Sequence, residues 1–231
     1  MTTDQPDSPV APDGCCTVDP RIARHFDKRM HDQAVAGTLP ELVAISRRLL
    51  ELLSDVGSLQ PRVLELGAGS GALSVELLER GAVAADGIDL SPESVAMAQR
   101  RAAAAGVADR ASFSVGDGAQ VALAAHDWVI LDRVICCYPN MDALLANAVG
   151  AARRRICFSI PASTGWRGLV TRSVVILENA TNRFRGRPCP GYVHDVGRIE
   201  ARLAAAGFAR LREARAGMWY ASVWERADSV S

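Results

Sequence analysis

The sequence has no hydrophobic run that approaches the roughly 18 apolar residues needed to cross a bilayer. Residues 1–13 are polar, acidic and rich in proline, and they lack the basic start and apolar core of a secretion signal. These absences argue against a membrane-spanning or secreted protein. We therefore expect a cytoplasmic protein whose six cysteines are reduced thiols rather than disulfides.

Net charge is also lacking, because 26 basic and 26 acidic side chains cancel. A neutral chain has no strong long-range attraction to nucleic acid or to a membrane, and we expect neither as a partner. The charge is unevenly distributed, however, since residues 150–215 hold thirteen arginines against four carboxylates. That bias suits an anionic ligand, such as a carboxylate or an RNA backbone, or simply a solvated arginine-rich face.

The length of 231 residues and an apolar fraction of 49% are typical of one globular domain. The first residues carry several prolines and few large apolar side chains, which predicts a disordered tail. Two helical stretches follow, at 21–36 and 39–56, the second with apolar residues at helical spacing. The predicted organisation is a disordered tail at 1–19, a single domain over 20–226 with cap helices at 20–57 and a substrate-side insert at 161–193, and a tail at 227–231.

Short apolar strands alternate with helices through the middle of the chain, which predicts a parallel sheet with helices on both faces. The expected strands are 62–66, 84–89, 111–115, 128–131 and 155–160, and the expected helices are 72–80, 92–106 and 141–152. A helix at 199–206 and two strands at 209–214 and 219–225 follow. Ligands of such sheets bind beyond the carboxyl ends of the strands, so the loops there should hold the site.

The first of these loops is a glycine turn behind an acidic residue. Residues 65–71 read Glu-Leu-Gly-Ala-Gly-Ser-Gly, and such glycines let the backbone turn tightly and approach a ligand. The helix that follows directs free N–H groups toward that ligand. A dinucleotide-binding turn is similar, but Glu65 would repel a diphosphate. Its carboxylate suits instead the amino group of S-adenosylmethionine (SAM).

The next two strands also end in carboxylates. Asp89 lies about 20 residues after the glycine turn, where this architecture places a ribose-binding acid. Asp117, between two glycines, suits the adenine amino group and leaves room for a flat ring. Each acid has a local interpretation too, as a helix cap for Asp89 and an Asp-Gly turn for Asp117. Three acids at consecutive strand ends nevertheless favour one shared ligand.

These three loops together resemble the class I SAM-dependent methyltransferases. The matching segments are 63–71, 87–92 and 116–117, and 127–134 looks like the fourth strand and active-site edge of that family. The resemblance covers roughly residues 40–160. Within the family, the length and the late insert are most similar to the magnesium-protoporphyrin methyltransferase type of small-molecule enzyme.

The resemblance implies an α/β, Rossmann-like class I methyltransferase fold, with a seven-stranded, mostly parallel sheet, an antiparallel last strand and helices on both faces. It also implies SAM as the cofactor. The predicted cofactor-binding residues lie in the glycine turn and at the strand ends: Glu65, Gly67, Ala68, Gly69, Gly71, Asp89, Leu90, Gly116, Asp117, Gly118 and Asp132. No Asn-Pro-Pro-Tyr-like motif follows the fourth strand, which argues against methylation of exocyclic base or glutamine nitrogens.

On the acceptor side, the unusual feature is a cysteine pair, Cys136 and Cys137, followed by Tyr138. All three are predicted to contact the substrate. The cysteines suit an apolar pocket as small buried side chains, or, together with Cys15–Cys16, an arsenic-type metalloid methyltransferase. Their spacings match no zinc motif, so we predict no bound metal.

Methyl transfer is a direct displacement at a carbon that the cofactor activates, so the protein mainly aligns donor and acceptor and excludes water. A base is useful only when the acceptor carries a proton. The candidate catalytic side chains are Tyr138, His194 and His25, the histidines because they titrate near neutral pH. A core position for the tyrosine and surface positions for the histidines remain open.

The insert mixes aromatic side chains with arginines, a combination that suits an anionic aromatic ligand or stacked RNA bases. Trp166 and Arg167 are therefore predicted to contact the substrate. The insert also suits a lid helix whose apolar face turns to the core, with Leu169, Val170, Val174, Ile176 and Leu177 on that face.

The sequence thus predicts a SAM-dependent methyltransferase, an enzyme of class EC 2.1.1, that acts on a small-molecule acceptor by O-, N- or S-methylation. Two alternatives stay open: a metalloid methyltransferase that uses the cysteine pairs, and an RNA-modifying methyltransferase that uses the arginine-rich segment. A homodimer is also left open.

Overall fold

The computed structural model describes residues 24, 27–28, 30–32, 39–184 and 191–227. The predicted tail at 1–19, His25 and Cys15–Cys16 lie outside these ranges, as do the last four residues of the chain. Within the described ranges, no helix combines the length and the apolar character that a bilayer span requires.

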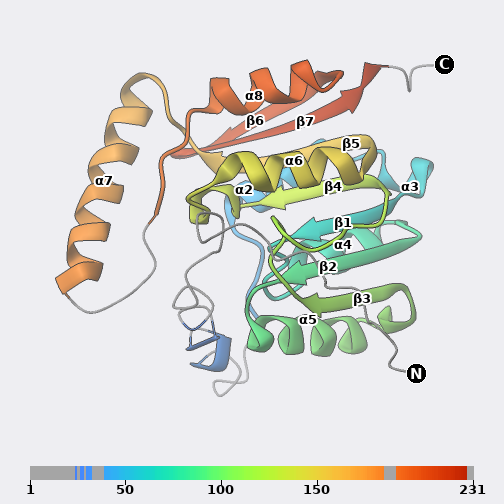
Figure 1. Ribbon diagram of the computed structural model, residues 1–231. Coiled ribbons are helices and arrows are strands. Elements are labelled where there is room, and N and C mark those ends of the chain that lie inside the picture. Colours follow the sequence, from blue (N-terminus) through green and yellow to red (C-terminus); the bar gives the residue numbers. More distant parts are fainter. Residues whose placement is uncertain (1–23, 25–26, 29, 33–38, 185–190, 228–231) are drawn as a thin grey trace, which may run out of the picture.

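One sheet of seven strands organises the chain (Figure 1). Its strands are β1 (Arg62–Leu66), β2 (Ala84–Asp89), β3 (Ala111–Val115), β4 (His126–Asp132), β5 (Ala152–Pro161), β6 (Phe208–Ala216) and β7 (Trp219–Arg226). Their order is β3-β2-β1-β4-β5-β7-β6, and β7 runs antiparallel to both of its neighbours. The predicted seven-stranded, mostly parallel sheet with an antiparallel last strand is therefore confirmed.

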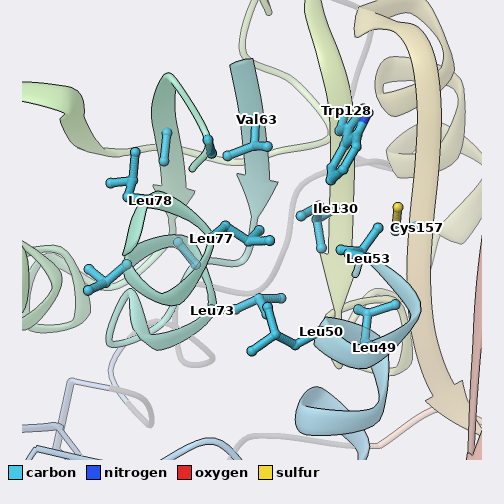
Figure 2. Close-up of a cluster of buried hydrophobic side chains, with 14 of the residues drawn as sticks. Leu49, Leu50, Leu53, Val63, Leu73, Leu77, Leu78, Trp128, Ile130 and Cys157 are labelled. Carbon is cyan, nitrogen blue, oxygen red and sulfur yellow. The ribbon is translucent and has the colours of Figure 1, made fainter. Parts of the chain in front are cut away.

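Helices cover both faces of the sheet. They are α2 (Ala44–Leu52), α3 (Val56–Leu59), α4 (Ala72–Glu79), α5 (Pro92–Ala104), α6 (Met141–Ala151), α7 (Gly165–Phe184) and α8 (Val196–Ala205). Leu49 of α2, the following Leu53 and Leu77 of α4 pack with Val63 and Trp128 on one face (Figure 2). Helices α6 and α8 pack on the opposite face. These two apolar layers hold the strand ends in fixed positions.

Local chemistry explains where several elements begin and end. The first three strands have the predicted bounds, whereas β4 and β5 are longer because His126 already pairs with Ala152. Ser91 caps α5 as expected, since its Oγ accepts a hydrogen bond from the N–H of Ser94 at 3.0 Å. The helix expected at 39–56 divides into α2 and α3, and Val43 is still extended, with φ −74° and ψ 165°.

The insert does form a helix, α7, but its predicted orientation is wrong. The apolar residues expected in the core are exposed, with Leu169 and Ile176 each at 69%. Its opposite side faces the protein, because Gly168 and Thr171 are buried there. A Cβ on Gly168 would lie 2.4 Å from the carbonyl of Ser163, so the contact depends on glycine. Figure 1 shows α7 projecting away from the sheet.

Candidate functional site

A cavity of about 210 Å³ opens at the carboxyl ends of the central strands, and we call it the strand-end cavity. Its walls come from the N-terminal segment, from the start of α4 and from the loops after β1, β2, β3 and β4. Its lining includes Met30, residues 40–43, Ser46, Glu65, residues 67–70, residues 88–90, Gly116, Gly118, residues 132–134, Cys137 and Tyr138. The cavity therefore lies where an open parallel sheet is expected to bind its ligand.

The glycine turn forms the floor of this cavity. Gly67, Gly69 and Gly71 all have positive φ angles, at 76°, 52° and 69°, which favour glycine. A Cβ on Gly67 would lie 2.5 Å from a methyl group of Val134, so the close approach of the loop after β4 requires glycine there. A Cβ on Gly69 would meet nothing within 4 Å. The backbone at Gly69 is thus open to a ligand.

Glu65 is a buried acid beside that turn, with 4% of its surface exposed. Its carboxylate accepts a hydrogen bond of 2.5 Å from the hydroxyl of Ser74 in α4. Burial, helped by the charges of Asp132 and Asp89 and opposed by the Ser74 hydrogen bond, raises its pKa to about 8. A positively charged ligand would relieve this electrostatic cost.

Asp89, at the end of β2, holds the loops together. One carboxylate oxygen accepts from the N–H of Gly69 at 2.8 Å, and the other from the N–H of Ser91 at 2.9 Å. Burial raises the pKa of Asp89, and these backbone hydrogen bonds limit the rise. Each oxygen keeps a further lone pair, so the carboxylate can also accept from hydroxyl groups in the cavity.

The loop after β3 presents Gly116 and Gly118 to the cavity, whereas Asp117 itself does not line it. Asp117 accepts hydrogen bonds from the hydroxyl of Tyr138 and from the N–H of Ala119, both at 2.9 Å. Burial and the neighbouring Asp117 charge raise the pKa of Tyr138, so its phenol stays protonated. In this structure Asp117 positions Tyr138, which forms one wall of the cavity.

Asp132 ends β4 and joins three elements. It accepts hydrogen bonds from the hydroxyl of Ser46 in α2 and from that of Ser159 in β5, the second at 2.5 Å. The next residue, Arg133, has a left-handed backbone with φ 57°. Its N–H donates to the hydroxyl of Ser159 at 3.0 Å. Ser159 therefore fixes the turn at this edge of the cavity.

The cysteine pair lies in the 3-10 helix η2 (Ile135–Cys137). Cys137 lines the cavity and Cys136 does not, and both thiols donate to the carbonyl of Arg133. Among the residues the structure describes, no three His, Cys, Asp or Glu side chains gather as metal ligands. His194 lies behind this segment, where its Nε2 is 2.8 Å from the carbonyl oxygen of Tyr138.

Trp166 and Arg167 do not reach the strand-end cavity. They line a second cavity, of about 410 Å³, on the side of the sheet that α8 covers. The Arg167 guanidinium stacks on the Trp166 ring at 4.8 Å from its centroid. The structure therefore separates these two predicted substrate residues from Cys137 and Tyr138.

Most of the predicted site residues meet in the strand-end cavity: Glu65, Gly67, Ala68, Gly69, Asp89, Leu90, Gly116, Gly118, Asp132, Cys137 and Tyr138 line it. Gly71 does not line it and instead packs α4 on α5, since a Cβ there would lie 2.8 Å from that of Ala98. Asp117, Cys136 and His194 stand behind the lining. His25 lies outside the described residues. The roles assigned to all these residues stay predictions.

Sequence reasoning missed several contributors. Met30 lines the cavity, and Asp27 accepts from the Ser91 hydroxyl at 2.6 Å, so the described part of the N-terminal segment contacts the loop after β2. Cap helices expected at 20–57 agree with contacts from this segment, but no pattern in the sequence singled out either residue. Ser46 did leave a signal, because it is a polar residue within the apolar stripe of α2, between Ile45 and Leu49.

Two comparisons by sequence give different results. Residues 63–154 match a family model described as a methyltransferase domain. No curated protein matches the sequence. The matched region runs from β1 to the beginning of β5 and so contains the loops after β1 to β4 that line the cavity.

Comparison of structures finds the same fold in magnesium protoporphyrin IX methyltransferase from Synechocystis PCC 6803. With bound SAH that enzyme is 22% identical, with a TM-score of 0.65 over 90% of this chain and 100% of that one. With bound SAM the values are 19%, 0.66, 92% and 100%. The cyclase SpnF is 13% identical, with a TM-score of 0.69 over 93% and 99%. The TM-scores show a shared fold, and at identities this low the comparison shows the fold alone.

Proposed function

Because this chain carries the methyltransferase domain and the seven-stranded sheet of the class I SAM-dependent methyltransferases, we propose that it methylates a small molecule in the strand-end cavity. The observation that carries the proposal is the meeting of two buried acids with the open backbone of Gly69 in one cavity. The acceptor would lie beside Cys137 and Tyr138, at the end of the cavity formed by the loop after β4.

The cavity residues fit SAM group by group. Asp89 would accept from the ribose hydroxyls, since its carboxylate already lies against the glycine turn through Gly69. Glu65 would accept from the amino group, whose positive charge offsets the cost of burying a carboxylate. Gly116 and Gly118 line the cavity between β3 and Tyr138, where the adenine ring would lie.

When bound, SAM supplies a methyl carbon activated by the sulfonium. The chain's own residues then have two tasks, which are to align the acceptor and to exclude water. Apolar side chains of Met30, Leu42 and Val43 would close the cavity on the side of the N-terminal segment. Tyr138 would serve as a fixed wall rather than a base, because its phenol donates to Asp117 and its pKa is raised.

The arginine-rich segment supports a small molecule over RNA. Carboxylates from distant parts of the chain neutralise several of its arginines: Glu225 pairs with Arg154 and Arg155, Asp55 with Arg155, and Asp142 with Arg198 and Arg202. RNA binding requires unpaired cations along a groove. Nothing in the described residues favours the metalloid alternative, and the cysteines at 15 and 16 lie outside them.

The proposal is tested by calorimetry and by following a labelled methyl group from SAM. Asp89→Ala should weaken SAM binding by about 1.5–3 kcal/mol, the usual contribution of a hydrogen bond to a charged group. The matched control is Asp109→Ala, an exposed acid outside the cavity, which should bind SAM as the wild type does. Equal affinity for the two variants would reject the role of Asp89. Absence of labelled product from a small-molecule cell extract would reject the proposed activity.

A further inference from the structure

We propose that the guanidinium of Arg133 binds an anionic group of the methyl acceptor, a carboxylate or another oxyanion, and thereby selects anionic acceptors. This inference rests on the proposed function, because it concerns the acceptor end of the same cavity. Three observations on Arg133, the residue directly after β4, support it: its backbone conformation, the surroundings of its side chain and its position in the cavity.

The backbone of Arg133 adopts a conformation that arginine seldom has. Its φ of 57° lies in the left-handed region, and Gln60 is the one other residue besides glycine with a positive φ in the described ranges. The N–H of Arg133 donates to Ser159, at 3.0 Å to the hydroxyl and 3.3 Å to the carbonyl. A glycine would adopt this turn without strain, so the strained arginine indicates a use for its side chain.

The side chain is held in place but has no charged partner among the residues that the structure describes. Its guanidinium lies over the ring of Trp219, with Cζ 5.4 Å from the ring centroid. Its Nε is buried and has no hydrogen-bond partner among the described residues. The neighbouring carboxylate of Asp132 is taken by Ser46 and Ser159. A buried donor of a charged group without a partner is costly, and an incoming oxyanion would satisfy it.

Arg133 is also distinct within the cavity. Among the described lining residues it is the single basic side chain, alongside the acids Glu41, Glu65, Asp89 and Asp132. The acids suit the positive charges of SAM. An arginine offers two parallel N–H donors, and these match the two oxygens of a carboxylate or phosphate. The cavity thus combines acids suited to a cation with one arginine suited to an anion.

The position of Arg133 assigns the anion to the acceptor rather than to SAM. The acids proposed to hold SAM lie at the carboxyl ends of β1 and β2, whereas Trp219 begins β7, two strands beyond β4 in the opposite direction. Since the guanidinium reaches over Trp219, it points away from the proposed SAM groups. A carboxylate held there would anchor the acceptor and leave a different atom to receive the methyl group, because ion pairing reduces the nucleophilicity of the bound oxygens.

The test measures binding of benzoate, and of the neutral benzamide as a matched probe, to the protein saturated with S-adenosylhomocysteine. Wild type should bind benzoate at least about tenfold more tightly than benzamide. Arg133→Gln should lose about tenfold or more in benzoate affinity without a change for benzamide. Arg133→Lys, which keeps the charge, should recover part of the loss. Arg172→Gln, at an exposed position of α7, should behave as wild type.

Calorimetric titration with SAM separates the two proposals. If the wild-type protein does not bind SAM, the proposed function itself is overturned. Normal SAM binding with equal affinities for benzoate and benzamide, or with no benzoate binding, would overturn the role of Arg133 alone. If Arg133→Gln weakened SAM tenfold and left benzoate unaffected, the anion would be the carboxylate of SAM and the inference would be wrong. Thermal unfolding of each variant confirms that the fold is intact.

Discussion

Binding of SAM near pH 7 should release close to one proton per protein, with Glu65 as its main source. Before SAM binds, burial and the charges of Asp132 and Asp89 raise the pKa of Glu65 to about 8, against the hydrogen bond from Ser74. One pH unit below its pKa, a carboxyl group is protonated in about nine of ten molecules. An ammonium group bound beside Glu65 would favour the carboxylate and lower this pKa. The proton would then leave to the buffer.

Calorimetry in buffers with different ionisation enthalpies measures this release, because the observed binding enthalpy changes in proportion to the protons that the buffer takes up. The expected slope in wild type corresponds to about 0.9 proton near pH 7, from the pKa of about 8. The slope should decrease as the pH rises above 8, because Glu65 is then already ionised before SAM arrives.

Two variants identify the source of the proton. Glu65→Gln should lose most of the release, and the difference from wild type isolates this group, since burial also raises the pKa of Asp89. Glu76→Gln, which replaces a half-buried acid of α4 paired with Arg80, should keep the wild-type slope. The reasoning is refuted if wild type and Glu65→Gln release the same number of protons. Glu65 would then be ionised before binding, or remote from the charge of SAM.

Further predictions concern stability. The ligand-free protein should lose stability as the pH rises from about 4.5 to about 8, because the folded state holds the Glu65 proton longer than the unfolded chain; urea unfolding at both ends of that range should show a smaller decline for Glu65→Gln. Arg155→Met should lower the free energy of unfolding by about 3–5 kcal/mol, since it removes ion pairs with Asp55 at 2.9 Å and Glu225 at 3.2 Å; a loss below about 1 kcal/mol in denaturant titration would contradict this. Ile176→Glu in α7 should change stability by less than about 0.5 kcal/mol, because this side chain is 69% exposed. A larger loss would show that the face is covered in solution, and sedimentation would reveal whether a second copy covers it.

The sequence predicted the first strands and turns around the strand-end cavity well because their signals are local. A strand, a glycine turn and a helix follow one another within residues 62–79, so the spacing of apolar residues and the local composition are enough to predict them. Glu65 and Asp89 are adjacent to such turns, and the parallel sheet then brings the strand ends together. The prediction needed no knowledge of contacts between distant residues beyond the general rule for parallel sheets.

The orientation of α7 shows where such reasoning fails. An apolar stripe at helical spacing indicates that one face of a helix is apolar, but it does not indicate what that face contacts. The packing of α7 depends instead on Gly168 and Thr171, which are small or polar and give no hydrophobic signal. Trp166 and Arg167 belong to the same helix, so its orientation also decides where these two side chains lie. Their combination of an aromatic and a cation matched a ligand site, yet they lie in the other cavity.

The end of the cavity around Arg133 depends on contacts between residues far apart in the chain, and this difference explains why the sequence motifs indicate a cofactor but not an acceptor. Asp132 joins Ser46, 86 residues earlier, to Ser159, 27 residues later, and Ser159 in turn holds the left-handed turn of Arg133. Trp219, from the other end of the chain, then orients the guanidinium. None of these partners is recognisable from a segment of the sequence, because each is an ordinary residue until the fold brings it to β4. Substitutions at these distant positions should therefore change the choice of acceptor while leaving the binding of SAM largely intact.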